Sequence, residues 1–255
     1  MSNLGSAHNL NDPWDDPGLI QSKLFPVPSH KDYLHLVDLN DFMKAQASSE
    51  ALTILDYGAG ASPYKAYFPN SDYRRADITD APSLRYKIQP DSTIAEADGT
   101  FDLIISTQVA EHVPNPEVYF KECFRLLKPG GKLILSTHGI WDEHGSPYDF
   151  QRWTDNGLIR DLKHGGFKQP DIYKLTCGMR AALLIFTRAL YATTPPAPPI
   201  RRIFFKSLRW FYSKLIPRVS QLSNHWFAED KIVKVIEAGN PTPTWYIVIA
   251  AVVQK

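Results

Sequence analysis

Histidines in two short segments provide the groups that could take up a proton. Glu111 and His112 follow one predicted strand, and His138 and His144 follow the next strand along the chain. Both segments are expected at the edge where parallel strands end, which is where such sheets bind ligands. An imidazole changes charge near neutral pH, so His112, His138 and His144 are candidate general bases for a hydroxyl. For each of them, simple packing or surface exposure is the alternative.

A polar pair lies in the segment H-G-S-P-Y-D-F-Q-R-W-T that begins at His144. Asp149 and Arg152 could hold a polar acceptor such as a sugar, because a carboxylate and a guanidinium both hydrogen-bond to hydroxyls. The alternative is that they pair with each other. Tyr148 and Trp153, in the same segment, are expected to pack.

A glycine turn follows an apolar strand at L-T-I-L-D-Y-G-A-G, residues 52–60. Asp56 closes the strand, and Gly58 and Gly60 allow a tight turn where a Cβ would collide with a ligand. The pattern predicts a nucleotide-type cofactor site at the carboxyl end of the strand. The third glycine of the dinucleotide fingerprint is missing, since Ala61 and Ser62 follow.

Strands and helices alternate around this turn. The helix expected first would cover the cofactor site, and the alternation predicts a doubly wound α/β fold with a parallel sheet. The predicted helices are 32–47, 118–127 and 154–163, and the predicted strands are 52–56, 73–78, 99–107, 132–137, 171–176 and 245–253. Gly130 and Gly131 are expected to stop the second helix, and the final strand is expected inside the sheet beside 171–176.

Four motifs in this order resemble the class I S-adenosylmethionine-dependent methyltransferases, in the type 11 branch. They are the glycine turn, the F-D-hydrophobic strand from Phe101, E-H-V at 111–113 and L-L-K-P-G-G at 126–131. The resemblance covers residues 52–167. It implies a Rossmann-like, seven-stranded, mostly parallel sheet with an antiparallel last strand. The block after His144 is similar to bacterial methyltransferases of surface polysaccharide assembly, which implies a sugar hydroxyl as acceptor.

The resemblance also implies the cofactor, S-adenosyl-L-methionine, with S-adenosyl-L-homocysteine as product, and a set of cofactor contacts. Asp56 would lie near the amino end, and the backbone of Gly58, Ala59 and Gly60 near the methionyl and ribose portions. Asp77 would bind the ribose hydroxyls and Ile78 would pack on the adenine. Asp91 and Ser92 would meet the adenine amine, and Gln108 would face the methyl-transfer side.

No metal is predicted. Quinone-pathway O-methyltransferases with a similar segment carry E-x-x-E-H, which can hold a divalent ion, but Gln108 replaces the first acid here. Losing one carboxylate weakens a hard-cation site. The remaining histidines show no C-x-x-C or H-x-x-x-H spacing.

About seventy residues separate the last two strands, where the family has a short hairpin. This helical insertion, residues 177–240, holds an apolar helix at 179–191, a proline-rich hinge at 193–199 and a basic aromatic stretch at 200–218. Such a stretch could form a helix in a membrane interface. Alternatively, it could be a lid packed on the core.

Four parts are therefore expected along the 255 residues: an N-terminal arm (1–31), the cofactor-binding core (32–176), the insertion (177–240) and the final core strand (241–255). A net charge of +1 and the lack of a basic motif argue against nucleic acid as a partner. The chain shows no signal peptide and no spanning run, and its two cysteines are expected to be reduced. A cytoplasmic protein is expected, with peripheral contact at the inner membrane face through 200–218 as an addition.

Three functions stay open at this point. The first is a sugar O-methyltransferase acting on a surface glycan or a lipid-linked glycan precursor. The second is a methyltransferase of a quinone or another apolar small metabolite, which the aromatic insertion would line. The third is a non-catalytic scaffold that binds the cofactor. The oligomeric state is not predicted.

Overall fold

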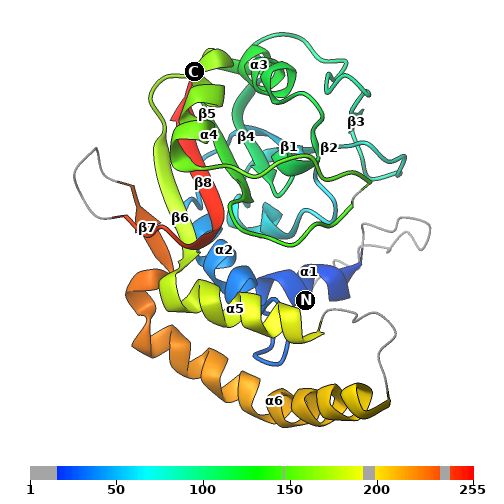
Figure 1. Cartoon of the computed structure of the whole chain (residues 1–255). Helices are drawn as coiled ribbons and strands as arrows, with labels where there is room; N and C mark the ends of the chain where they lie inside the picture. Colours follow the sequence, from blue (N-terminus) through cyan, green and yellow to red (C-terminus); the bar gives the residue numbers. More distant parts are fainter. Residues whose placement is uncertain (1–15, 146, 192–198, 236–241) are drawn as a thin grey trace.

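A mixed β-sheet forms the centre of the protein (Figure 1). The computed structural model describes residues 16–145, 147–191, 199–235 and 242–255. Within these ranges the strand order is β3-β2-β1-β4-β5-β8-β6-β7. The strands are β1 (Thr53–Tyr57), β2 (Asp72–Asp77), β3 (Tyr86–Lys87), β4 (Phe101–Thr107), β5 (Leu127–His138), β6 (Asp171–Cys177), β7 (Ile232–Lys234) and β8 (Tyr246–Gln254).

The predicted strand arrangement is confirmed. The pairs β2·β3, β1·β2, β1·β4 and β4·β5 are parallel, and β8 lies antiparallel between β5 and β6. The sheet has eight strands where seven were predicted, because the short β7 adds an antiparallel edge beside β6. All the carboxyl ends of β1, β2 and β4 therefore meet at one edge, as a ligand site requires.

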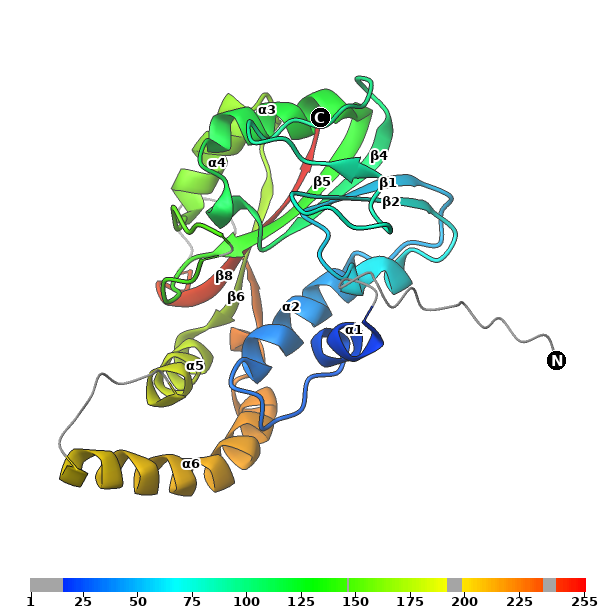
Figure 2. The same ribbon diagram turned by 90° about the vertical axis from the view of Figure 1, so that its right-hand side faces the viewer.

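Helices cover both faces of the sheet (Figures 1 and 2). On one face lie α3 and α4, and on the other lie α1, α2 and α5, with α6 beyond α5. The helices are α1 (Pro17–Leu24), α2 (Tyr33–Ala45), α3 (Pro116–Leu126), α4 (Asp155–His164), α5 (Gly178–Tyr191) and α6 (Pro199–Trp226). The single turns η1 (Pro63–Tyr67), η2 (Ala110–His112) and η3 (Ala228–Asp230) are 3-10 helices.

Local sequence signals explain where the covering helices begin. The side chain of Asn115 accepts a hydrogen bond from the amide of Val118, and Thr154 accepts one from Gly157, so both residues cap their helices. The apolar faces that follow are buried in two cores. Phe120 and Leu162 belong to the first, under α3 and α4. Leu34, Phe42 and Leu184 belong to the second, under α2 and α5.

Two features differ from the sequence-based expectations. Residues 128–131 belong to β5 and not to a turn, since α3 ends at Leu126 and the strand starts at Leu127 with a register shift against β4. The N-terminal arm contains α1, which packs on α2. Residues 1–15 of the arm and 192–198 of the proline-rich hinge lie outside the described residues.

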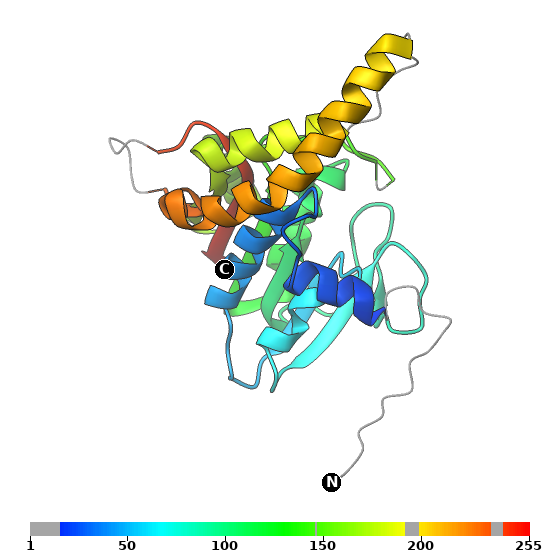
Figure 3. The same cartoon turned by 90° about the horizontal axis from the view of Figure 1, so that it is seen from below.

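The insertion is attached to the core through a buried ion pair. Arg180 of α5 donates to Asp38 of α2 at 2.6 Å, and both side chains are fully buried. Thr176 also donates to Asp38, while Arg180 reaches Ser223 and Asn224 of α6. The C-terminal half of α6 is thereby fixed to α5 and α2. In Figure 3 the N-terminal half of α6 extends away from the rest of the molecule.

Among the described residues, the helices are either too short or too polar to cross a bilayer.

Candidate active site

A cavity of about 950 Å³ lies at the carboxyl ends of β1, β2 and β4. It is much larger than a water site, and its volume is that of a small-molecule pocket. The described lining residues are Leu19, Lys23, His35, Leu36, Leu39, Tyr57, Gly58, Ala59, Gly60, Ala61, Pro63, Tyr64, Asp77, Ile78, Thr79, Lys87, Ile88, Gln89, Pro90, Ser92, Thr107, Gln108, Val109, His112, Val113, Pro114, Pro147 and Tyr148. None of these belongs to the described part of the insertion, so that part does not line the cavity as the quinone hypothesis expected.

The glycine turn forms one wall of this cavity. Gly58 has a φ of 72°, in the left-handed region that favours glycine. A Cβ at this position would collide with the side chain of Val109, which follows β4. Protein packing therefore requires a glycine at position 58, in addition to the close backbone approach that a ligand needs. Gly58, Ala59 and Gly60 all line the cavity, as predicted for cofactor contacts.

Asp77 lies at the end of β2 and is held against the glycine turn. Its Oδ2 accepts a hydrogen bond from the amide of Gly60 at 3.0 Å, and Oδ1 accepts one from the amide of Thr79. The hydroxyl of Thr79 also donates to Oδ1 at 3.3 Å, and the side chain of Asp77 lines the cavity beside Ile78. This placement fits the binding of a vicinal diol next to a planar ring.

The other predicted cofactor residues divide into two groups. Ser92 and Gln108 line the cavity, and the amide nitrogen of Gln108 lies 3.2 Å from the hydroxyl of Ser136. Asp56 is not a lining residue, because its carboxylate accepts a hydrogen bond from Tyr73 inside the fold; burial raises its pKa to about 6. Asp91 is exposed and accepts bonds from Thr93, which hold its pKa below the usual range.

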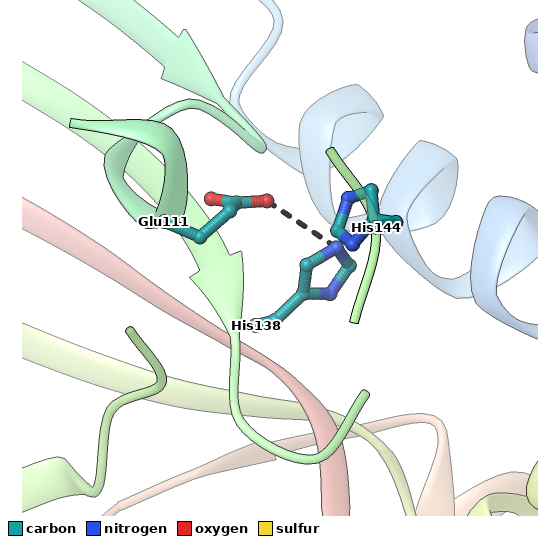
Figure 4. Close-up of side chains that lie close together, drawn as sticks. All are labelled: Glu111, His138 and His144. Carbon is teal, nitrogen blue, oxygen red and sulfur yellow. Dashed lines mark ion pairs between the residues drawn. The ribbon is translucent and has the colours of Figure 1, made fainter. Parts of the chain in front are cut away.

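The predicted bases lie together around Glu111 (Figure 4). Nε2 of His138 is 3.3 Å from Oε1 of Glu111, and the rings of His138 and His144 are 5.2 Å apart. His112 brings its Nε2 to 4.0 Å from the same oxygen. Of the three histidines only His112 lines the cavity. His138 and His144 are close to this wall but are not among the lining residues, although both were predicted to face the acceptor.

Burial controls the charge of this cluster. Glu111 is inaccessible to solvent, and burial raises the pKa of its carboxyl group even though Thr137 donates to it. His138 is almost as buried, and burial holds the pKa of its imidazole far below the usual value, so that this ring is neutral. The ring stacks on Trp141 at 4.5 Å, and the Arg188 guanidinium covers the indole.

Asp149 and Arg152 pair with each other. The guanidinium of Arg152 donates to both carboxylate oxygens, at 2.5 and 2.6 Å. Asp149 also accepts a bond from the amide of His144, and neither residue of the pair lines the cavity. Of the two alternatives considered for these residues, the structure shows the ion pair. Trp153 is buried and donates to Asp161, as expected of a packing residue.

A family profile described as "Methyltransferase domain" matches residues 33–170, which is more than half of the chain. The chain belongs to this methyltransferase family. The match runs from α2 to the end of the α4 region, so α5, α6 and β8 lie beyond it.

Curated relatives of the methyltransferase include proteins named for quinone biosynthesis. A ubiquinone biosynthesis O-methyltransferase of Xanthomonas oryzae pv. oryzae is 31% identical over 113 residues, covering 38% of this chain and 47% of the relative. A 2-methyl-6-phytyl-1,4-hydroquinone methyltransferase of Synechocystis is 26% identical, covering 57% and 55%. The chain thus spans about half the length of the curated relatives it matches.

Solved structures confirm the fold. The phosphoethanolamine N-methyltransferase 2 of Haemonchus contortus, solved with S-adenosyl-L-methionine, superposes with a TM-score of 0.51 and 14% identity over 93% of this chain and 55% of the neighbour. A SAM-dependent methyltransferase of Archaeoglobus fulgidus superposes with a TM-score of 0.50 and 12% identity, over 93% and 99%. At these identities the likeness concerns the Rossmann-like fold alone.

One lining residue of the methyltransferase, His35, was missed by sequence reasoning. It lies in the first turn of α2, where an isolated histidine in an apolar helix gives no functional signal. Its ring is buried, and it lies 5.0 Å from Trp141 and 5.9 Å from His138. Burial lowers the pKa of His35 to about 4. The charged or titratable groups that also act on it are Asp32, Lys23, Arg188 and His144.

The low pKa of the buried His35 ring should make the free energy of unfolding depend on pH. The pKa of His35 is about 4 in the folded chain and about 6.5 when unfolded. The free energy of unfolding is therefore unaffected by this ring above pH 6.5 and decreases as the pH falls toward 4, because the unfolded chain takes up the proton first. Relative to a His35→Gln variant, the wild type should lose about 2 kcal/mol of unfolding free energy between pH 7 and pH 5. Urea denaturation at both pH values measures this difference. The exposed His164→Gln variant is the control, and equal pH profiles for both variants would contradict the assignment.

Proposed function

We propose that this protein transfers the methyl group of S-adenosyl-L-methionine to a hydroxyl of an apolar, quinone-type small molecule. The observation that supports this proposal is the mixed lining of one cavity. The glycine turn and Asp77 supply polar groups, and the rest of the wall is largely apolar and includes His35 and His112. The relatives named for quinone and hydroquinone methylation support this class of acceptor.

The polar end suits the cofactor. The backbone of Gly58 to Gly60 approaches the methionyl and ribose portions, and the carboxylate of Asp77 accepts the ribose hydroxyls. Ile78 and Ile88, which directly follow β2 and β3, cover the adenine, with Ser92 at its edge. The donor carries a sulfonium next to a labile methyl group, so the protein has to align the donor and the acceptor without forming a covalent intermediate.

The apolar end suits a flat acceptor. Leu19, Leu36 and Leu39 come from α1 and α2, while Val113 follows η2 and Tyr148 comes from the segment after β5. A hydroxyl must lose its proton as it attacks the methyl group. His112 suits this role because its Nδ1 lies 2.6 Å from the carbonyl oxygen of Tyr148 and must donate to it. Its Nε2 therefore carries the lone pair.

The sugar hypothesis has less support. It came from the resemblance of the block after His144, and its expected acceptor contacts, Asp149 and Arg152, satisfy each other outside the cavity. A glycan acceptor would also need several polar groups to hold its hydroxyls, whereas Leu36, Leu39 and Val113 line the wall next to His112 and His35.

Methyl transfer to defined acceptors tests the proposal. The protein is incubated with methyl-labelled S-adenosyl-L-methionine and a hydroquinone with a short prenyl tail, and the control acceptor is the same molecule with both hydroxyls methylated. Labelling of the free hydroquinone alone is expected. Labelling of nucleotide sugars in preference to the hydroquinone would favour the glycan alternative, and cofactor binding without any transfer would favour the scaffold.

A membrane location would bring the enzyme to such an acceptor, and we propose α6 as the contact. Residues 199–226 contain the cations Arg201, Arg202, Lys206, Arg209, Lys214 and Arg218 and no acidic residue. Ile203, Trp210 and Phe211 are more than half exposed. A helix that presents exposed aromatic side chains among cations fits the interface of an anionic membrane. The lid alternative has no support from the described lining residues.

Liposome association should depend on these aromatic side chains. A Trp210→Ala/Phe211→Ala variant is expected to bind vesicles that contain anionic lipid at least about tenfold more weakly, because two rings leave the interface. Co-sedimentation measures the partition. Trp245→Ala is the matched control, since Trp245 is also exposed, at 62%, but precedes β8 and does not belong to α6. Equal binding of both variants and the wild type would exclude the α6 contact.

A further inference from the structure

We propose that Glu111, His138 and His144 bind a divalent transition metal ion. Each residue offers one ligand atom, and the three atoms lie within 4.8 Å of one another. They come from η2, from the end of β5 and from the segment after it, and their side chains point toward one another (Figure 4). No motif in the sequence joins these positions, and the prediction of no metal considered only the E-x-x-E-H pattern, where Gln108 replaces the first acid, and C-x-x-C or H-x-x-x-H spacings.

Two buried atoms of the cluster have no hydrogen-bond partner among the described residues. They are Oε1 of Glu111 and Nδ1 of His138. His138 Nε2 lies only 3.3 Å from that carboxylate oxygen, yet the contact does not satisfy it as a hydrogen bond. A buried carboxylate oxygen without a partner has lost its hydration without gaining a hydrogen bond, which is unfavourable. A cation between the carboxylate and the imidazoles would remove this cost.

The ligand types select the ion. Two imidazoles and one carboxylate are the ligand set of many zinc sites and of other first-row divalent ions, whereas Mg²⁺ and Ca²⁺ prefer oxygen ligands alone. The proposed set differs from the E-x-x-E-H pattern, because it uses histidines at the end of β5 and beyond, and does not use Gln108. It leaves a fourth coordination position available.

Neighbouring groups hold the ligands in place, as is usual around metal sites. Thr137 donates to the second oxygen of Glu111 at 2.8 Å. Nδ1 of His144 lies 3.5 Å from Oδ2 of Asp149, whose carboxylate is fixed by Arg152. The Asp149–Arg152 pair thus becomes part of the support of the site.

His112 connects the site to the cavity. Its Nε2 atom lies 4.0 Å from Oε1 of Glu111, and its side chain lines the cavity wall. A bound cation next to this wall would lower the pKa of an acceptor hydroxyl and so favour the attacking oxyanion. This role depends on the proposed methyl transfer, whereas metal binding itself does not.

Zinc titration of the full chain tests the site. Metal-free protein is titrated with Zn²⁺ by calorimetry, and one equivalent should bind. His144→Ala, which alters the most exposed ligand, and His138→Ala should each weaken zinc binding at least about tenfold. His164→Ala, at an exposed histidine on α4, is the matched control and should bind like the wild type. The Co²⁺-loaded protein should show the visible absorption of a low-symmetry site, and His144→Ala should lose it.

Absence of zinc binding by the wild type, or equal binding by the wild type and both ligand variants, would overturn the proposal. S-adenosyl-L-methionine titrations of the same samples distinguish a failure of the metal site from a failure of the proposed function. Cofactor binding without zinc binding would remove only the metal site. Zinc binding that depends on His138 and His144 without cofactor binding would support the metal site and remove the methyltransferase activity.

Discussion

An Arg180→Ala substitution is expected to lower the free energy of unfolding by about 3–5 kcal/mol, because it leaves the buried carboxylate of Asp38 without its cation. Both side chains are inaccessible to solvent, and Arg180 donates to Asp38 through two nitrogens, at 2.6 and 3.1 Å. The guanidinium also joins Ser223 and Asn224 of α6. One substitution would therefore loosen the contacts between α2, α5 and α6.

Urea denaturation measures this loss. Arg160→Ala is the matched control: it removes the same side chain from a surface pair with Asp161 and should cost far less stability than Arg180→Ala. An Asp38→Leu/Arg180→Met double variant should recover much of the stability, since it leaves no buried charge without a partner. A small effect of Arg180→Ala, similar to that of the control, would show that the insertion is not fixed to the core by this pair.

Asp77→Ala is expected to weaken S-adenosyl-L-methionine binding roughly ten- to hundredfold, or about 1.5–3 kcal/mol, the usual loss for hydrogen bonds to a charged group. The carboxylate faces the cavity, and it also holds the amide of Gly60 in the glycine turn. Its removal would take away the ribose acceptor and loosen the turn that approaches the cofactor.

Asp91→Ala separates this effect from a general loss of acidic charge. Asp91 was also predicted to contact the cofactor, but its carboxylate is exposed and bound to Thr93. Its removal should leave cofactor affinity within about twofold of the wild type. If Asp91→Ala weakens binding while Asp77→Ala does not, the placement of the cofactor along β2 is wrong.

Much of the fold could be predicted from local patterns. β8 is a nearly continuous apolar run, as expected of a strand buried on both faces, and β1 and β4 each contain a short apolar stretch. Thr154 and the acidic and basic ends of α4 mark that helix clearly. The edge strand β7 could not be predicted, because three residues carry no periodicity and its pairing with β6 depends on the preceding insertion.

Some residues of the site could also be predicted from local sequence, and others could not. Gly58, Gly60 and Asp77 could be placed because the end of a strand and the following turn position them locally. The contact between Glu111, His138 and His144 depends on the parallel pairing of β4 and β5, which brings the segments after these strands together. For Asp149 and Arg152 the sequence left an acceptor contact and a mutual ion pair open, because sequence alone does not show that a charged pair is already satisfied.

Titration calorimetry of the purified protein with S-adenosyl-L-methionine and S-adenosyl-L-homocysteine, with NAD as the control ligand, tests the central claim most directly. One equivalent of each of the first two should bind in the micromolar range, and NAD should not bind, since the third glycine of the dinucleotide fingerprint is missing. Absence of binding by both methyl-donor ligands, or tighter binding of NAD, would contradict the assignment of this cavity to a methyltransferase cofactor.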